Sequence, residues 1–174
     1  MKRSHISRIV LLAAGLAGCQ NLPSDAPHAT AQLQPSKGAK TTGTADFYQV
    51  GNKVRVVANV SGLTPGREHG FHVHEAGDCS SGDGMSAKGH FNPQGMPHGD
   101  PRGSERHAGD MPMLRADASG NAKLDTELDI MTVTAGPTSV VGRGLIVHAD
   151  PDDYKTQPTG NAGARLACAV IQRR

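Results

Sequence analysis

The stretch Thr42-Gly-Thr-Ala-Asp-Phe-Tyr-Gln-Val-Gly-Asn-Lys-Val-Arg-Val-Val-Ala-Asn-Val-Ser-Gly-Leu63 decides the fold class of this chain. Valine and other β-formers alternate in part with polar residues over 53–60, as in a strand with one face in water. Gly51-Asn52 separates this run from the one before it and is typical of a two-residue hairpin turn. The stretch therefore predicts two antiparallel strands, 42–50 and 53–63.

The composition of the whole chain supports an all-β architecture with many turns. The 174 residues include 22 glycines and 11 prolines, but only two tyrosines, three phenylalanines and no tryptophan. So many turn residues and so few aromatic ones indicate short strands joined by loops rather than a helical bundle. The length predicts a single domain and excludes a (β/α)₈ barrel, which needs about 250 residues. Further strands are expected at 29–35, 70–75, 111–117, 121–128, 141–150 and 164–171.

Two long stretches without a strand pattern separate these expected strands. They are residues 76–110 and residues 149–163, and both are too long for simple connections. Connections of this length inside a compact domain usually carry function. We therefore expect both stretches to be functional loops.

The N-terminus resembles an export signal. Lys2, Arg3 and Arg8 form a charged region, and the run 9–18 that follows carries no polar side chain. This run is far shorter than the 18 or more apolar residues of a membrane-spanning helix. Leu16-Ala-Gly-Cys19 resembles the bacterial lipobox, in which the signal is cut just before the cysteine. The alternative is an ordinary secretory signal that happens to contain a cysteine.

The lipobox interpretation divides the chain into three parts. We expect residues 1–18 to be a lipoprotein signal peptide and Cys19 to carry lipid as the first mature residue. Residues 19–28 are rich in proline and polar residues, which predicts a flexible tether before a folded domain at 29–174. The expected location is the bacterial periplasm, with the lipid on Cys19 as the sole attachment to a membrane.

Charge and cysteine content limit the function classes further. Without the three cations of the leader, 15 basic residues face 16 acidic ones, and no basic stripe is present. This excludes the electrostatic pattern of a DNA- or RNA-binding protein. With Cys19 lipidated, Cys79 and Cys168 remain as an even pair in an oxidising compartment. A bridge between them would close about 90 residues and contribute roughly 4–5 kcal/mol.

Histidines supply the candidate chemistry. His72 and His74 stand two residues apart in an expected strand, so both imidazoles face the same side and are able to approach one metal ion. Taken alone, this spacing fits a solvated strand face equally well. His148 ends the apolar run 144–147, where a functional residue and a satisfied core histidine are both reasonable interpretations.

The loop at 76–110 carries a stronger pattern. Three imidazoles and a carboxylate within this glycine- and proline-rich loop suit a four-coordinate zinc ion: His90, His98, His107 and Asp110. A bound metal would also organise a loop that lacks regular structure. The alternative is a polar, disordered loop in which the histidines are incidental.

Four separated blocks of the chain carry a family resemblance. They are Gly70-Phe-His-Val-His-Glu-Ala-Gly-Asp78, Gly89-His-Phe-Asn-Pro93, Glu105-Arg-His-Ala-Gly-Asp110 and Gly160-Asn-Ala-Gly-Ala-Arg-Leu-Ala-Cys-Ala169. In this order they resemble the copper–zinc superoxide dismutase family over about residues 29–174, and the lipobox resembles its bacterial exported branch. The resemblance implies an eight-stranded Greek-key β-sandwich, or flattened barrel, with two long functional loops.

The resemblance also implies a role for each matching residue. Copper would be held by His72, His74, His90 and His148, and zinc by His90, His98, His107 and Asp110. We expect His90 to bind both metals at once through its two ring nitrogens. Arg165 matches the arginine that guides the substrate and Asp152 the carboxylate that supports ligands of both metals. Cys79 and Cys168 match the disulfide within the subunit.

The implied activity is the disproportionation of superoxide into dioxygen and hydrogen peroxide, which would protect the cell envelope. A metal-sequestering lipoprotein of the same fold is the competing hypothesis. A zinc hydrolase is a third possibility, but the sequence lacks the His-Glu-x-x-His motif expected of that class. The family contains dimers and monomers, so a homodimer is an open alternative. Lys155 and Lys88 are weak candidates for steering the substrate. No metal is assigned to the remaining histidines, His5, His28 and His69.

Overall fold

Ten strands and one short 3₁₀ helix make up residues 28–174, the part of the chain that this computed structural model describes. The expected signal peptide 1–18, Cys19 and the tether up to residue 27 lie outside the described residues. The strands are β1 (His28–Pro35), β2 (Thr42–Val50), β3 (Lys53–Ser61), β4 (Glu68–His69), β5 (Phe71–His74), β6 (Leu114–Arg115), β7 (Ala122–Leu128), β8 (Gly144–His148), β9 (Arg165–Val170) and β10 (Gln172–Arg173), with the helix η1 (Met85–Ala87) between β5 and β6. Within the described residues, no helix is long and apolar enough to span a membrane.

The hairpin predicted from residues 42–63 is confirmed. β2 and β3 pair along their whole length, and Val50 opposite Lys53 closes the ladder around a turn at residues 51–52. Along β3 every second residue is buried, with Val54 and Val56 fully inside the core. This alternation places one face of the strand against the core and the other in water.

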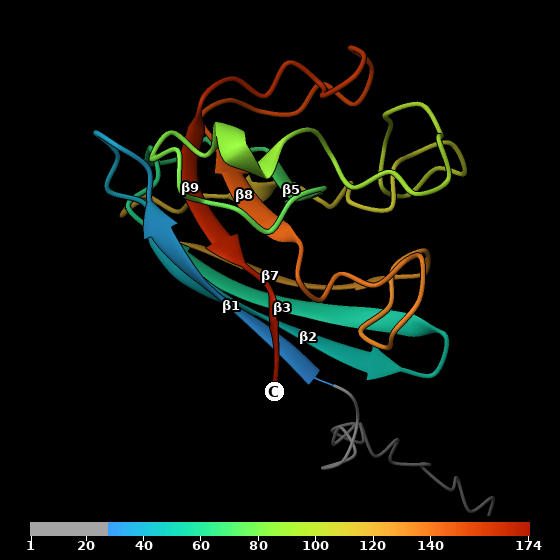
Figure 1. The fold of residues 1–174 in the computed structure, drawn as a ribbon. Coiled ribbons are helices and arrows are strands. Elements are labelled where there is room, and N and C mark those ends of the chain that lie inside the picture. The colour runs from blue at the N-terminus through green and yellow to red at the C-terminus, as the bar shows by residue number, and fades with distance from the viewer. Residues whose placement is uncertain (1–27) are drawn as a thin grey trace, which may run out of the picture.

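One curled antiparallel sheet contains most of the strands, in the order β5-β8-β9-β1-β2-β3-β7. β1 joins the two halves, because it pairs with β2 over most of its length and with β9 only at Gln34–Pro35. The sheet therefore folds into two layers, with β1, β2, β3 and β7 in one and β5, β8 and β9 in the other (Figure 1). The all-β prediction is confirmed and each expected strand is present, but the one expected at 111–117 shortens to β6 and the one expected at 141–150 to β8.

The second layer differs from the first because it is buried on both sides. All residues of β5 and β8 are buried. Phe71 and Val73 of β5 point into the main apolar core, whereas the alternate positions carry His72 and His74. Loops 76–110 and 149–163 cover the layer and contain no strand (Figure 1).

A disulfide ties one of these loops to the sheet. Cys79, in loop 76–110, is bonded to Cys168 of β9, 89 positions further along the chain. Ala87 and Ile146 pack with this pair in a small apolar cluster separate from the main core. The bridge holds the first part of the loop against β8 and β9.

Candidate metal centre

The first group of ligand-type side chains is built mainly on strands. His72 and His74 alternate with core residues along β5, and His148 ends the neighbouring strand β8. His90 joins them from loop 76–110 through an isolated bridge to His74. All four side chains are buried, and one nitrogen from each lies within 4.8 Å of the others.

Backbone carbonyls fix the orientation of two of these rings. His74 donates from Nδ1 to the carbonyl of Lys88 at 2.9 Å, and His148 donates from Nδ1 to the carbonyl of Gly163 at 3.3 Å. The two Nε2 atoms then face each other at 3.3 Å. Hydrogen bonds of this kind select the tautomer and aim the free nitrogen at a common point, as they do around bound metals.

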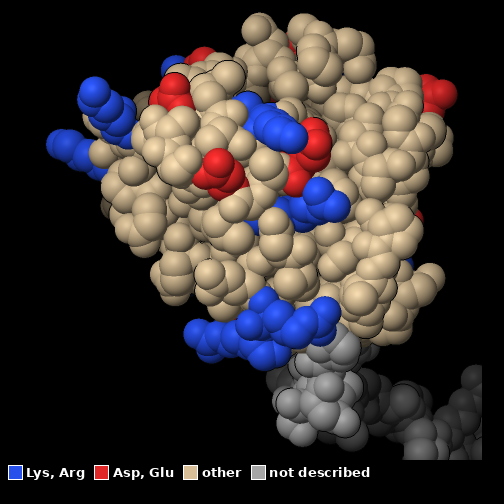
Figure 2. Space-filling model, viewed as in Figure 1, with Lys and Arg blue, Asp and Glu red and all other residues tan. Residues whose placement is uncertain are grey.

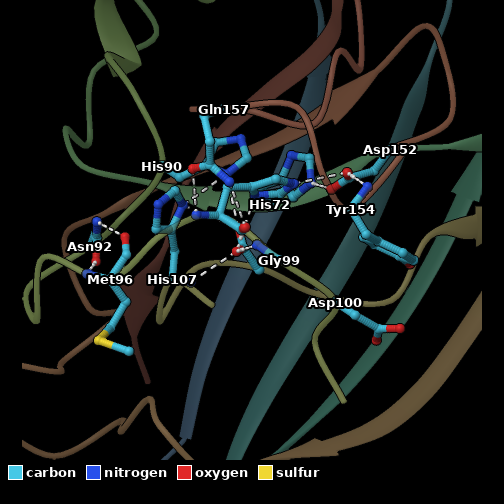
Figure 3. A network of polar contacts seen from close by, with 12 residues as sticks. His72, His90, Asn92, Met96, Gly99, Asp100, His107, Asp152, Tyr154 and Gln157 are labelled. Atoms are coloured by element: carbon cyan, nitrogen blue, oxygen red, sulfur yellow. Dashed lines mark hydrogen bonds and ion pairs between the residues drawn. The ribbon is translucent and has the colours of Figure 1, made fainter. Parts of the chain in front are cut away.

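The second group belongs to the loop alone. Asp110 Oδ1 lies 2.8 Å from His90 Nδ1, and Asp110 Oδ2 lies 3.1 Å from His98 Nδ1. His107 completes the group, with Nδ1 at 3.4 Å from both His90 Nδ1 and Asp110 Oδ1 (Figure 3). Three imidazoles and a carboxylate, all buried and within 4.8 Å, match the donors of a tetrahedral zinc site.

The free edge of β5 holds this loop in place. Val73 donates to the carbonyl of Gly109 and accepts from the amide of Phe91, both at 2.9 Å. The close approach requires glycine at position 109, because a Cβ there would lie 2.2 Å from the Val73 carbonyl oxygen. The loop thus extends the sheet for a few residues and brings His90 and Asp110 beside β5.

The donor atoms fit a pair of metal ions that share one histidine. His90 belongs to both groups, and its Nδ1 lies 2.8 Å from Asp110 Oδ1 of the second group. Among the described residues, its Nε2 and the Nδ1 of His72 are buried without a hydrogen-bond partner. Buried polar atoms without a partner are unfavourable, and metal coordination would satisfy both of them.

Asp152 connects the two groups from outside. It accepts from His72 Nε2 at 2.7 Å and from His98 Nε2 at 2.9 Å (Figure 3). Loop 149–163 carries Asp152 and wraps closely around it, so that a Cβ on Gly160 would lie 1.8 Å from Asp152 Oδ1 and 2.5 Å from His98 Nε2. Gly160 also has a φ of 65°, which favours glycine.

Burial and hydrogen bonding shift the pKa of the first-group histidines and that of His98 in opposite directions. Burial lowers the pKa of His74 and His148 well below the usual range and lowers that of His90 to about 4, so these rings are neutral ligands at pH 7. Burial also lowers the pKa of His98, but hydrogen bonds to Asp110 and Asp152 outweigh it and raise the value to about 9.

Asp110 and Asp152, the hydrogen-bond partners of His98, have lowered pKa values. Burial acts to raise the pKa of Asp110, yet hydrogen bonds from His107, His90 and His98 hold it far below its ordinary value. The pKa of Asp152 is lowered in the same way, because hydrogen bonds from His72 and His98 outweigh its burial. Both carboxylates are therefore ionised at neutral pH and provide negative charge beside the loop-built group.

Arg165 lies at the start of β9, with its guanidinium fixed by the disulfide-bonded loop. Its Nη1 donates to the carbonyl of Gly84 at 2.6 Å and its Nη2 to that of Lys88 at 2.5 Å. The carbonyl of Lys88 therefore receives hydrogen bonds from both Arg165 and His74. The same carbonyl group therefore holds both the guanidinium of Arg165 and the ring of His74 in position.

Sequence reasoning missed the supporting role of three residues. Gln157 holds the backbone of His98 from both sides, since its Oε1 accepts from the His98 amide and its Nε2 donates to the His98 carbonyl, each at 2.9 Å. His69, expected to be unremarkable, is fully buried and donates from Nδ1 to the carbonyl of His148 at 2.9 Å. The third is Lys88, through its carbonyl. Neither His69 nor His28 belongs to a ligand group, and His5 lies outside the described residues.

Comparisons with known proteins agree with this geometry. The family model for copper/zinc superoxide dismutase matches residues 41–171. A Cu-Zn superoxide dismutase of Paramecium bursaria Chlorella virus 1 is 45% identical over 135 residues, 74% of this chain and 71% of the relative. One from Aquifex aeolicus is 40% identical over 150 residues, 83% and 86% of the two chains. The solved structure of the clock protein EA4 superposes with a TM-score of 0.77 at 37% identity, covering 88% of this chain and 98% of that one.

Proposed function

The chain belongs to the copper/zinc superoxide dismutase family and is a copper- and zinc-dependent superoxide dismutase, and from this premise we propose a role for each residue of the centre. Copper is held by the strand-built group, which consists of His72, His74, His90 and His148. Zinc is held by the loop-built group, which consists of His90, His98, His107 and Asp110. The sharing of His90 by two buried ligand groups is the observation that supports this proposal most directly.

The residues of the chain then divide the work of dismutation. Copper, when bound, supplies the one-electron oxidation and reduction that disproportionation requires, and zinc supplies a fixed positive charge. His90 Nε2 carries a proton to the peroxide product when it is not engaged as a ligand. Asp110 and Asp152 keep the surrounding rings oriented through this exchange.

Arg165 recognises the substrate. Superoxide is a small anion, and a guanidinium held by two carbonyls presents its remaining N–H groups in a fixed direction. Because the carbonyl of Lys88 also orients His74, the anion and the copper ligand are aligned by the same element. Attraction by such a cation raises the rate of encounter and weakens as salt is added.

The cellular role follows from the N-terminal sequence. We propose that residues 1–18 direct export and that lipid on Cys19 anchors the protein. Residues 19–27 then form a tether that holds the domain, which begins with His28 of β1, in the periplasm, where it protects the envelope from superoxide. Mass spectrometry of the protein from the membrane fraction should find residue 19 as the N-terminal residue, with lipid attached to Cys19. A mature chain whose Cys19 carries no lipid would disprove lipid anchoring.

The decisive test of the activity is the decay of superoxide in the presence of the full chain loaded with copper and zinc. We expect decay far above that produced by a metal-loaded variant in which His90 is replaced by Ala. Equal decay by the two proteins would favour the competing hypothesis, in which the fold sequesters metal without turnover.

A further inference from the structure

The main chain of His98 is held differently from that of the other members of the loop-built group. His90 is flanked by hydrogen bonds to β5. His107 and Asp110 close a turn, in which the Asp110 amide donates to the His107 carbonyl at 3.3 Å. His98 has neither kind of support: in the part of the chain that the structure describes, both of its main-chain hydrogen bonds go to the side chain of Gln157.

The amide of Gln157 pairs with His98 as a neighbouring strand would. Its Oε1 accepts from the His98 amide and its Nε2 donates to the His98 carbonyl, each at 2.9 Å (Figure 3). His98 is only 3% exposed, and buried main-chain groups without a partner are unfavourable. The position of the His98 main chain therefore depends on this one side chain from loop 149–163.

The same loop also holds the far end of the His98 ring. Asp152 Oδ1 accepts from His98 Nε2 at 2.9 Å and from the Tyr154 amide at 2.7 Å. Tyr154 is itself anchored, because its phenol oxygen accepts from the Met113 amide at 3.3 Å. His98 Nδ1 faces Asp110 and is the nitrogen available to a metal. Both ends of this ligand are therefore positioned by a loop to which His98 does not belong.

Fixed geometry matters at this group because copper and zinc do not differ in charge. Both are divalent cations, and the face seen in Figure 2 carries basic and acidic side chains close together, so surface charge favours neither ion. Copper(II) binds more tightly than zinc to most sites and prefers a tetragonal arrangement of donors, whereas zinc takes a tetrahedral one. A site therefore selects zinc only if its donors are kept from rearranging around copper.

We propose that Gln157 determines the metal specificity of the loop-built group: by fixing the main chain of His98, it keeps the donors from rearranging and so favours zinc over copper. The proposal rests on the function proposed above, which assigns zinc to this group. Gln157 does not bind the metal and acts only through His98. Without its two hydrogen bonds the group would still bind metal, but it would discriminate less between the two ions.

Gln157→Met tests this proposal, because methionine has a similar length but lacks the amide. Gln157 lies at the surface, so the substitution leaves no buried void. The full chain is loaded with one equivalent each of copper and zinc and is then equilibrated with increasing concentrations of free copper. The variant should lose half of its zinc at a copper concentration about tenfold lower than the wild type does, as for other residues that orient a ligand. Metal analysis of the washed protein measures the zinc retained, independently of turnover.

Cobalt(II) bound in place of zinc reports the geometry of the same group. Tetrahedral cobalt absorbs visible light much more strongly than cobalt with six ligands. We expect the absorption per bound cobalt to be weaker in Gln157→Met than in the wild type. A merely structural role of Gln157 would lower the unfolding temperature without changing this spectrum.

Gln49→Met is the matched control. The Gln49 side chain also bonds to the main chain on two sides, since its Oε1 accepts from the Val133 amide at 2.9 Å and its Nε2 donates to the carbonyls of Gly51 and Lys53, each at 3.0 Å. None of these partners belongs to a ligand group. The control should therefore retain zinc as the wild type does and give the wild-type cobalt spectrum.

Two results would overturn the role of Gln157. One is a Gln157→Met protein with the zinc retention and the cobalt spectrum of the wild type. The other is a Gln49→Met protein that loses zinc as readily as Gln157→Met, because a general loss of stability would then explain the effect. A wild type that retained no zinc and gave no tetrahedral cobalt spectrum would refute the zinc assignment itself.

Discussion

The two ligand groups share His90 but are built from different kinds of structure. The strand-built group takes His72, His74 and His148 from adjacent hydrogen-bonded strands. The loop-built group has no regular element of its own and depends on Asp110, which contacts all three of its histidines. The sheet therefore positions the first group before any metal binds, whereas one carboxylate gathers the second.

The two groups therefore depend on different parts of the structure for their order. Removing one side chain from the strand-built group leaves the ladder between β5 and β8 intact, so the loss should be confined to chemistry. Removing Asp110 leaves three buried imidazoles with no common acceptor, so the loss should spread through the loop. Variants of the two groups should differ in kind as well as in size.

The largest effect is expected for His148→Ala. The variant should lose at least about a hundredfold in superoxide dismutation, more than the usual loss for residues that only orient a ligand. Its fold and zinc content should stay close to those of the wild type, because β8 remains paired with β5 and β9. Activity assays and metal analysis of the purified protein test this, and a still-active variant would contradict the copper assignment.

Asp110→Ala should have the next largest effect, and it should be structural. We expect zinc to be lost and loop 76–110 to be cleaved about tenfold faster by proteases, since its common acceptor is gone. Asp100→Ala is the matched control, because Asp100 lies in the same loop but pairs only with the exposed Arg102. Digestion of both variants at the wild-type rate would contradict the hypothesis that zinc bound through Asp110 orders the loop.

Asp152→Asn tests the connection between the groups. An amide cannot accept from both His72 and His98 as the carboxylate does, so affinity should fall about 10–100-fold for both metals. Asp153→Asn is the control, since Asp153 lies next in the chain and its side chain accepts hydrogen bonds only within its own turn, from Lys155 and Thr156. A loss limited to one metal would show that Asp152 serves a single group.

The smallest of these effects is expected for Arg165→Glu. It leaves every ligand in place but reverses a charge beside the copper group, so turnover should slow about tenfold at low salt. The rate should also lose its decline with increasing ionic strength, because attraction is replaced by repulsion. Stopped-flow measurements over a range of salt concentrations test this, and an unchanged rate would remove Arg165 from substrate guidance.

The sequence predicted the strands that have an alternating pattern and the loop that is rich in metal-ligating residue types. Alternation and the Gly51-Asn52 turn identified the β2–β3 hairpin, and the residue types at 90, 98, 107 and 110 identified a metal-type loop. The supporting residues escaped prediction because they act through hydrogen bonds that involve backbone groups distant in sequence. Gln157 reaches His98 across 59 positions, and no periodic pattern marks such a contact.

The missing side chain at position 160 has a consequence for how this protein varies. Gly160 holds no metal and carries no charge, yet one added carbon would displace Asp152 and His98 together. A library that randomised loop 149–163 under selection for survival in superoxide would keep glycine there while accepting changes at exposed neighbours. Gly160 is therefore constrained by its neighbours although it has no functional group of its own.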